Sequence, residues 1–159
     1  MKSDHNTHPG PNADQQERAR WMSVLAKAPD ETLAEAVAQF GELPAYLWLR
    51  KPETGLAMVR ARTGGSGTQF NLGEMSVTRC ALRLSSGETG LAYVAGRSVR
   101  HAEWAAIFDA LMQTDAKAIV QSTIIAPLEK ILAVQRAETV AAAKASKVEF
   151  MTMVRGEDA

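Results

Sequence analysis

Hydrophobic side chains at three- and four-residue spacings mark two helices near the start of the chain. Asp14, followed three residues later by Glu17, is typical of a helix cap with its reciprocal glutamate. The apolar side of the helix that they open comprises Trp21, Leu25 and Ala28. Asp30 can cap a second helix, which stops at Gly41. Its apolar positions are Leu33, Val37 and Phe40.

From residue 44 the apolar spacing changes to two, which is the period of a β-strand. Four segments alternate in this way, and they cover residues 45–50, 56–62, 75–84 and 91–97. We interpret Lys-Pro-Glu-Thr-Gly at 51–55 as a turn, the glycine-rich residues 63–67 as a loop, and Ser-Ser-Gly-Glu-Thr-Gly at 85–90 as a hairpin turn. Because the connections are short, the four strands are expected to pair antiparallel.

Alternation also sorts the side chains of this sheet into two faces. In the third strand, one face carries Thr78, Cys80, Leu82 and Leu84, and the other carries Val77, Arg79, Ala81 and Arg83. In the second strand, Arg60 and Arg62 lie with Met58, opposite Ala57, Val59 and Ala61. We therefore expect an apolar face that is covered and a second face that carries arginines.

Helical spacing returns after Ser98, which can cap a helix with Trp104, Phe108 and Leu111 on its apolar side. A shorter apolar helix over 116–125 is expected next, and Pro127 suits the first turn of a last, longer helix that becomes rich in alanine. Residues 148–154 (VEFMTMV) alternate again, which predicts a C-terminal strand with no neighbour in sequence to pair with.

The order of these elements predicts an α+β fold: two N-terminal helices, an antiparallel sheet of about four strands, two to three C-terminal helices and a final strand. Residues 1–13 are polar and broken by proline and glycine, so we expect a disordered tail. Residues 14–159 are expected to form a single domain, with 148–159 available as a strand that binds a partner.

Composition narrows the class of protein. The 159 residues are 46% hydrophobic, and no apolar run approaches the roughly 18 residues of a membrane span. No secretory signal is visible, and a single cysteine cannot form an internal disulfide, so we expect a cytoplasmic protein with no membrane partner. The formal net charge of +0 argues against a general nucleic-acid binder.

Positive charge is nevertheless concentrated in the middle of the chain. Residues 50–100 contain eight Lys or Arg against three acids, and seven of the eight are arginine. Arginine has the planar fork that suits phosphate and carboxylate groups. The strongest candidates for contact with substrate or partner are Arg60, Arg62, Arg79 and Arg97. An equally simple interpretation is an exposed sheet face with scattered surface charge.

A glycine loop at 63–67 (TGGSG) is a second candidate for anion binding. Gly64, Gly65 and Gly67 could turn backbone N–H groups toward a phosphate. The loop matches neither the Walker pattern nor the dinucleotide pattern, however, and a flexible hairpin loop is the simpler interpretation. Asn71 and Glu74 follow on the same connection and complete the candidate set, although a lone glutamate is more often a solvated residue than a general base.

Signs of autonomous catalysis are absent from the sequence. Cys80 sits on the apolar face of its strand, which indicates a buried hydrophobe rather than a reactive thiolate. His5 and His8 have no third ligand nearby, so no metal site is expected. No cofactor of the chain's own is predicted, and its catalytic residues remain unknown.

The central block, residues 49–97, resembles the signature of the PhnG family in its phrases MVRARTGGSG, FNLGE, VTRC and GLAYVAGR. The ending KVEFMTMVRGED (147–158) and the opening RARWMSVLAKA (18–28) are similar to the same family, so the resemblance covers nearly all of the chain beyond residue 13.

The resemblance implies a small subunit of the bacterial carbon–phosphorus lyase core complex. In the step that it serves, ATP and methylphosphonate give ribose 1-methylphosphonate 5-triphosphate and adenine. Expected partners are the core subunits PhnI, PhnH and PhnJ, with ATP entering as a substrate of the complex, and PhnI is expected to be the main catalytic chain. The chain would thus belong to a transferase without being catalytic alone.

Two alternatives to such a subunit remain at this stage. An autonomous module that binds a phosphorylated small molecule could use the same glycine loop and arginines. An RNA-binding sheet is the weaker alternative, because aromatic side chains do not interleave with the arginines.

Overall fold

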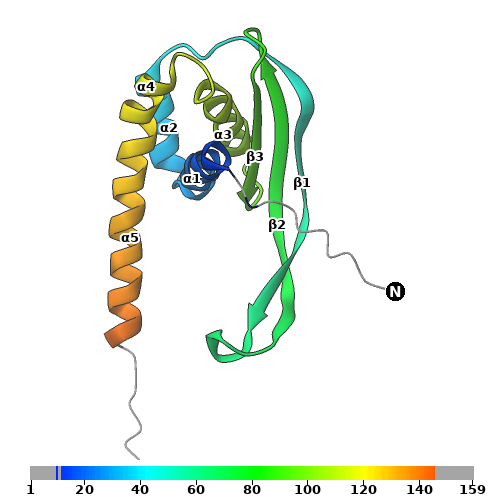
Figure 1. Ribbon diagram of the computed structural model, residues 1–159, viewed down its shortest axis with the longest axis vertical. Coiled ribbons are helices and arrows are strands. Elements are labelled where there is room, and N and C mark those ends of the chain that lie inside the picture. Colours follow the sequence, from blue (N-terminus) through cyan, green and yellow to red (C-terminus); the bar gives the residue numbers. More distant parts are fainter. Residues whose placement is uncertain (1–9, 11, 146–159) are drawn as a thin grey trace, which may run out of the picture.

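A computed structural model describes residue 10 and residues 12–145, and it shows a three-stranded sheet with helices on one side (Figure 1). In chain order the elements are α1 (Ala13–Lys27), α2 (Asp30–Phe40), β1 (Tyr46–Arg62), η1 (Thr63–Gly65), β2 (Gln69–Leu84), β3 (Thr89–Ala95), α3 (Val99–Leu111), α4 (Lys117–Val120), η2 (Gln121–Ile125) and α5 (Ala126–Ala145). The α+β class is confirmed. The predicted tail at 1–13 falls almost wholly outside the described residues, and the strand at 148–154 wholly so.

The sheet has the order β1-β2-β3 with antiparallel neighbours, and it has one strand fewer than predicted. Residues 51–55 are not a turn but part of the single long strand β1, where shifts of register between Trp48 and Arg50 and between Arg50 and Glu53 absorb extra residues as bulges. Pro52 is tolerated because it stands in an edge strand within the second register shift, where it has no ladder partner in β2.

The predicted apolar face of the sheet is confirmed. Thr78, Cys80, Leu82 and Leu84 are all buried, beneath α3, which packs on β2 and β3. At Gly90 the α3 backbone comes so close that an added Cβ would lie 1.8 Å from the Ala106 carbonyl oxygen. Only glycine therefore permits this spacing of helix and strand.

Two helix starts differ from the sequence prediction. The cap of α1 is Asn12, whose side chain accepts a hydrogen bond from the Gln15 backbone N–H at 2.8 Å. The Gln15 side chain in turn accepts one from the Asn12 backbone N–H at 3.0 Å. In α2 the cap is Pro29, and Asp30 instead lies 2.6 Å from Nδ1 of buried His101. Ser98 does cap α3, as predicted, by accepting from the His101 backbone.

The last two predicted helices form one continuous helix from Lys117 to Ala145. Pro127 lies in the first turn of α5, as predicted, and the π-helical turn η2 joins this helix to α4 without a break. By length and composition alone this helix could cross a membrane. Its first half, however, packs on α1 and α2, and four charged residues stand between 129 and 138, so we assign it to this domain's packing.

A buried carboxylate joins three elements of the core. Asp109 of α3 accepts from Arg18 Nη2 at 2.7 Å, from Trp21 Nε1 at 2.8 Å and from the Leu91 backbone at 2.9 Å, so it connects α1 and β3. Arg18 also donates to the Thr89 carbonyl at 3.1 Å. With its side chain fully buried, Asp109 needs all of these donors to offset the loss of water.

Removal of this carboxylate should strongly destabilise the domain. We expect Asp109→Ala to lower the free energy of unfolding by about 3 kcal/mol or more, because buried donors lose their only charged acceptor. Denaturant unfolding followed by circular dichroism measures the change. Asp115→Ala, in the exposed turn after α3, is the matched control and should stay within about 0.5 kcal/mol of wild type. Equal stabilities of the two variants would contradict the role of Asp109.

The contact between Asp30 and His101 should make stability depend on pH. The hydrogen bond from His101 lowers the pKa of Asp30 below its ordinary value of 3.8. A lowered pKa stabilises the fold above the unfolded-state pKa, and this contribution is lost as the pH falls through the folded-state pKa. We therefore expect Asp30→Asn to lower the melting temperature at pH 6, and this effect to shrink progressively as the pH falls below 3.8. A pH-independent difference would contradict the ionic contribution of Asp30.

Candidate functional site

The distal halves of β1 and β2 project beyond the rest of the sheet as a two-stranded ribbon (Figure 1). We use "ribbon" for residues 56–76. β3 pairs only with residues 77–83 of β2, whereas β1 pairs with β2 from Gln69 to Leu84. The ribbon therefore has no third strand beside it, and none of its residues is buried. It contains most of the residues that the sequence singled out.

One face of the ribbon gathers four of these predicted residues. Arg60 lies opposite Asn71 in the ladder, Met58 lies opposite Glu74, and Arg62 lies opposite Gln69. Directly opposed residues share a face, so both arginines stand together with the amide and the carboxylate. A bulge at Leu72 brings Asn71 to this side, since it shifts the alternation of β2 by one residue.

Neither arginine on this face is paired with an acid of the described chain. Arg62 Nη1 donates to the Gly67 carbonyl at 3.2 Å. The Arg60 side chain has no hydrogen bond or ion pair with any residue that the structure describes. By contrast, Arg18, Arg20 and Lys117 each contact a carboxylate at 2.7–2.9 Å. The ribbon thus offers two guanidinium groups to something outside itself.

The glycine loop at the tip of the ribbon closes on itself. Gly64 and Gly65 have positive φ angles of 59° and 84°, which turn the chain back between the strands. The Gly67 N–H, however, donates to the Thr63 carbonyl at 2.8 Å. A side chain at Gly67 would meet the same oxygen, at 2.6 Å from its Cβ. The loop therefore uses this amide to hold its own bend, which favours a hairpin loop over an anion nest.

Arg79 is separated from Arg60 and Arg62. The register is unbroken from the pair Glu53–Arg79 to the pair Val59–Gly73, so Arg79 lies on the opposite face from Arg60, the residue after Val59. Its Nε donates to Glu53 at 2.8 Å. Interaction with Tyr93 and then with Glu53 raises the pKa of Arg79. The four candidate arginines consequently do not form one face.

Arg97 lies outside the sheet, because β3 ends at Ala95 and not at residue 97. Gly96, with a φ of 97°, turns the chain toward α3 just before Arg97. The Arg97 side chain is exposed in this connection. It is therefore a surface residue near the sheet and not a member of a strand face.

Large apolar side chains on the ribbon are the feature that the sequence analysis missed. Five of them are 40–67% exposed: Leu56, Met58, Phe70, Leu72 and Met75. The uncovered side of the main sheet continues this surface with exposed Leu47, Leu91 and Tyr93. Strand alternation alone could not identify them, because the same pattern is produced by a face that a domain covers with its own helices.

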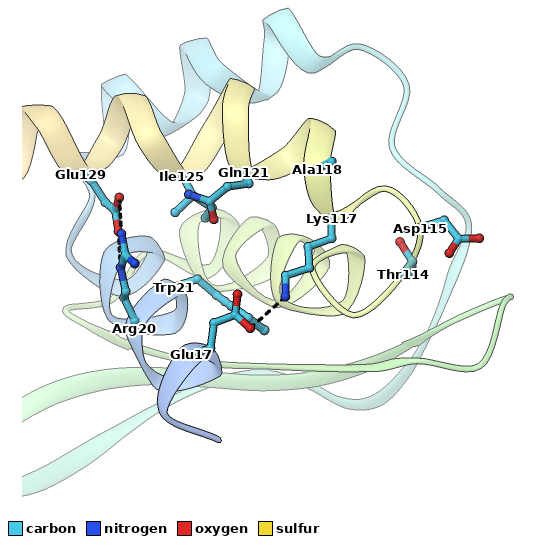
Figure 2. A pocket seen from close by; sticks show the side chains of 10 residues that line it. All are labelled: Glu17, Arg20, Trp21, Thr114, Asp115, Lys117, Ala118, Gln121, Ile125 and Glu129. Atoms are coloured by element: carbon cyan, nitrogen blue, oxygen red, sulfur yellow. Dashed lines mark hydrogen bonds and ion pairs between the residues drawn. The ribbon is translucent and has the colours of Figure 1, made fainter. Parts of the chain in front are cut away.

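A polar cavity of about 540 Å³ lies on the helical side, next to Trp21 (Figure 2). Figure 2 shows that its two cations are each bound to an acid: Arg20 to Glu129 and Lys117 to Glu17. Asp115 adds a further negative charge to the lining. With three acids against two bases, this cavity does not suit a triphosphate. It lies across the helical layer from the sheet and contains none of the predicted site residues.

Cys80 is buried in the core, as predicted. Its Sγ donates to the Ala102 carbonyl at 3.2 Å. Burial, with a smaller contribution from Glu103, raises the pKa of the thiol to about 12. Such a thiol is almost fully protonated at neutral pH and is a poor nucleophile. Among the described residues there is also no group of three or more His, Cys, Asp or Glu side chains that could hold a metal ion.

Comparison with known proteins gives a consistent picture. Residues 16–156 match the model of a family described as phosphonate metabolism protein PhnG. A curated relative from Rhizobium meliloti (strain 1021), the alpha-D-ribose 1-methylphosphonate 5-triphosphate synthase subunit PhnG, is 41% identical over 145 residues. The similarity covers 89% of this chain and 91% of the relative.

The burial of Cys80 predicts a thiol that is inert in the folded protein. At pH 8 we expect an aromatic disulfide reagent to release no chromophore from the native chain within minutes, and one equivalent after denaturation in guanidinium chloride. The physical reason is twofold, since the sulfur is shielded and its thiolate form is disfavoured. Rapid reaction of the native protein would show that the site opens or that the thiol is activated.

Proposed function

The chain belongs to the PhnG family of phosphonate metabolism proteins, and we propose that it is the accessory PhnG-type subunit of the bacterial carbon–phosphorus lyase core complex. The similarity over nearly the whole length of a synthase subunit carries this proposal. In the proposed role the chain is required when ATP and methylphosphonate give ribose 1-methylphosphonate 5-triphosphate and adenine. ATP is then a substrate of the complex, and the chain has no cofactor of its own.

An accessory role agrees with what the described residues offer chemically. The only cysteine is buried with a raised pKa, and the cavity beside Trp21 has its two cations paired with acids. A protein that acts through assembly needs surfaces rather than a reactive group. The ribbon and the bare side of the sheet supply such surfaces, since both expose large apolar residues to water.

The proposed partners are the other core subunits PhnI, PhnH and PhnJ, in the cytoplasm. An autonomous module for a phosphorylated small molecule has less support. Its glycine loop directs the Gly67 N–H inward, Arg79 lies on the opposite face of the sheet from the ribbon arginines, and Arg97 lies outside the sheet.

Arg60 and Arg62 are better placed than Arg79 to meet an anion from outside. Arg79 is already engaged by Glu53. The sequence-based expectation that Arg79 contacts substrate or partner stays an untested prediction. If it contacts substrate, Arg79→Lys should lower the activity of the assembled complex, because lysine keeps the charge and loses the fork.

The accessory role predicts that the isolated chain turns over nothing. Purified protein incubated with ATP and methylphosphonate should release no adenine above the blank, as measured by liquid chromatography. The complex obtained by co-expression with the other core subunits, and isolated through a tag on this chain, should release adenine. Adenine formation by the lone chain would refute the accessory role. Failure of the tagged wild-type chain to recover any core subunit would refute the assignment to the complex.

A further inference from the structure

The ribbon lacks the packing that normally stabilises a pair of strands in water. Two antiparallel strands without a third strand or a covering helix are marginally stable in water. Figure 1 shows residues 56–76 projecting away from the helices, none of these residues is buried, and the strands keep their ladder to the end at Arg62 and Gln69. We therefore expect the ribbon to pack against a surface outside this domain.

Both faces of the ribbon bear apolar side chains. Leu56 and Met58 stand on the face of the arginines. The opposite face has Met75 and Phe70 on β2, beside the small residues Ala57 and Ala61 on β1. Because neither face is wholly polar, neither resembles the solvated side of an ordinary antiparallel sheet. A partner that covers only one side would leave apolar surface in water.

The charge of the ribbon restricts what this partner can be. Arg60 and Arg62 carry two positive charges at neighbouring positions of one face, against the single acid Glu74. In the core, the cation beside a buried apolar side chain is paired with a carboxylate, as Arg18 is with Asp109 next to Trp21. Two unpaired guanidiniums in an apolar contact would be costly to bury without similar partners. The complementary surface must therefore supply acids.

From these observations we propose that the ribbon inserts into an apolar cleft of a neighbouring core subunit, whose rim supplies Asp or Glu side chains to Arg60 and Arg62. This inference rests on the proposed function and names the chemistry of the partner. Met58 and Leu56 contact the acidic side of the cleft, and Phe70 and Met75 contact its apolar wall. The glycine loop at 63–67, whose bend is held by its own hydrogen bonds, enters the cleft first as a preformed tip.

Aspartate substitutions on each face test the apolar contacts. Met58→Asp and Phe70→Asp place a charge where the proposal buries the side chain, so each should reduce recovery of the partner subunits from co-expressing cells by more than tenfold. Ile119→Asp is the matched control: Ile119 is also exposed, at 59%, but lies on α4. It should assemble as wild type does. Thermal melting of each isolated variant should match wild type, because the ribbon contributes nothing to the core.

Charge reversal tests the carboxylate rim. The double variant Arg60→Glu with Arg62→Glu should lose partner subunits by more than tenfold, while Arg60→Lys with Arg62→Lys should retain most assembly and become more sensitive to salt. Normal assembly of the reversed variant with loss of adenine release would mean that the arginines meet the anionic substrate, which overturns the proposed rim. Normal assembly of Met58→Asp and Phe70→Asp would overturn the insertion.

These outcomes are separable from failure of the proposed function. If the wild-type chain recovers no core subunit, the assignment to the complex itself is wrong. If wild type and the ribbon variants recover the subunits equally well, the assignment stands and only the ribbon's role is refuted.

Discussion

The buried carboxylate of Asp109 is the contact on which the arrangement of this domain depends. It binds two side chains of α1 and a backbone amide of β3 from its place on α3. A fully buried charge is tolerated only when its donors hold their positions, so this contact fixes where α1 and α3 lie on the sheet. Gly90, where the α3 backbone comes closest to β3, adds a steric constraint at the same junction. Together they confine the helical layer to one side of the sheet and to its β3 end.

This confinement explains why so much apolar surface remains outside. An antiparallel sheet needs only one covered face, and α3 supplies that cover over β2 and β3. β1 and β2 continue well past the last residue that pairs with β3, beyond the reach of the helices. The ribbon thus begins where the domain's own packing ends. Because β2 is part of both, the ribbon is anchored in the core through residues such as Cys80 and Leu82.

On the helical side the cations Arg18, Arg20 and Lys117 are bound to acids of the chain, and the polar cavity of Figure 2 is neutralised from within. On the ribbon Arg60 and Arg62 lack such acids. Charged groups at protein interfaces are commonly matched by opposite charges on the partner, so the two arginines suit an acidic partner surface. The 41% identical relative is named as a synthase subunit, and the proposed accessory role is consistent with this contrast.

The sequence by itself determined the α+β class, the two N-terminal helices, the buried face of β2 and the inert position of Cys80. These follow from local periodicity, because side-chain direction repeats every two residues in a strand and about every 3.6 in a helix. Local pattern could not tell a turn at 51–55 from bulges in one long strand, since proline and glycine signal both. Nor could it show which arginines share a face, because the bulge at Leu72 and the register with β2 decide that. Only the tertiary structure joined Arg18 to Asp109, which stand 91 residues apart, and left the ribbon uncovered. Contacts between distant segments depend on how the elements pack, and a local pattern does not contain that information.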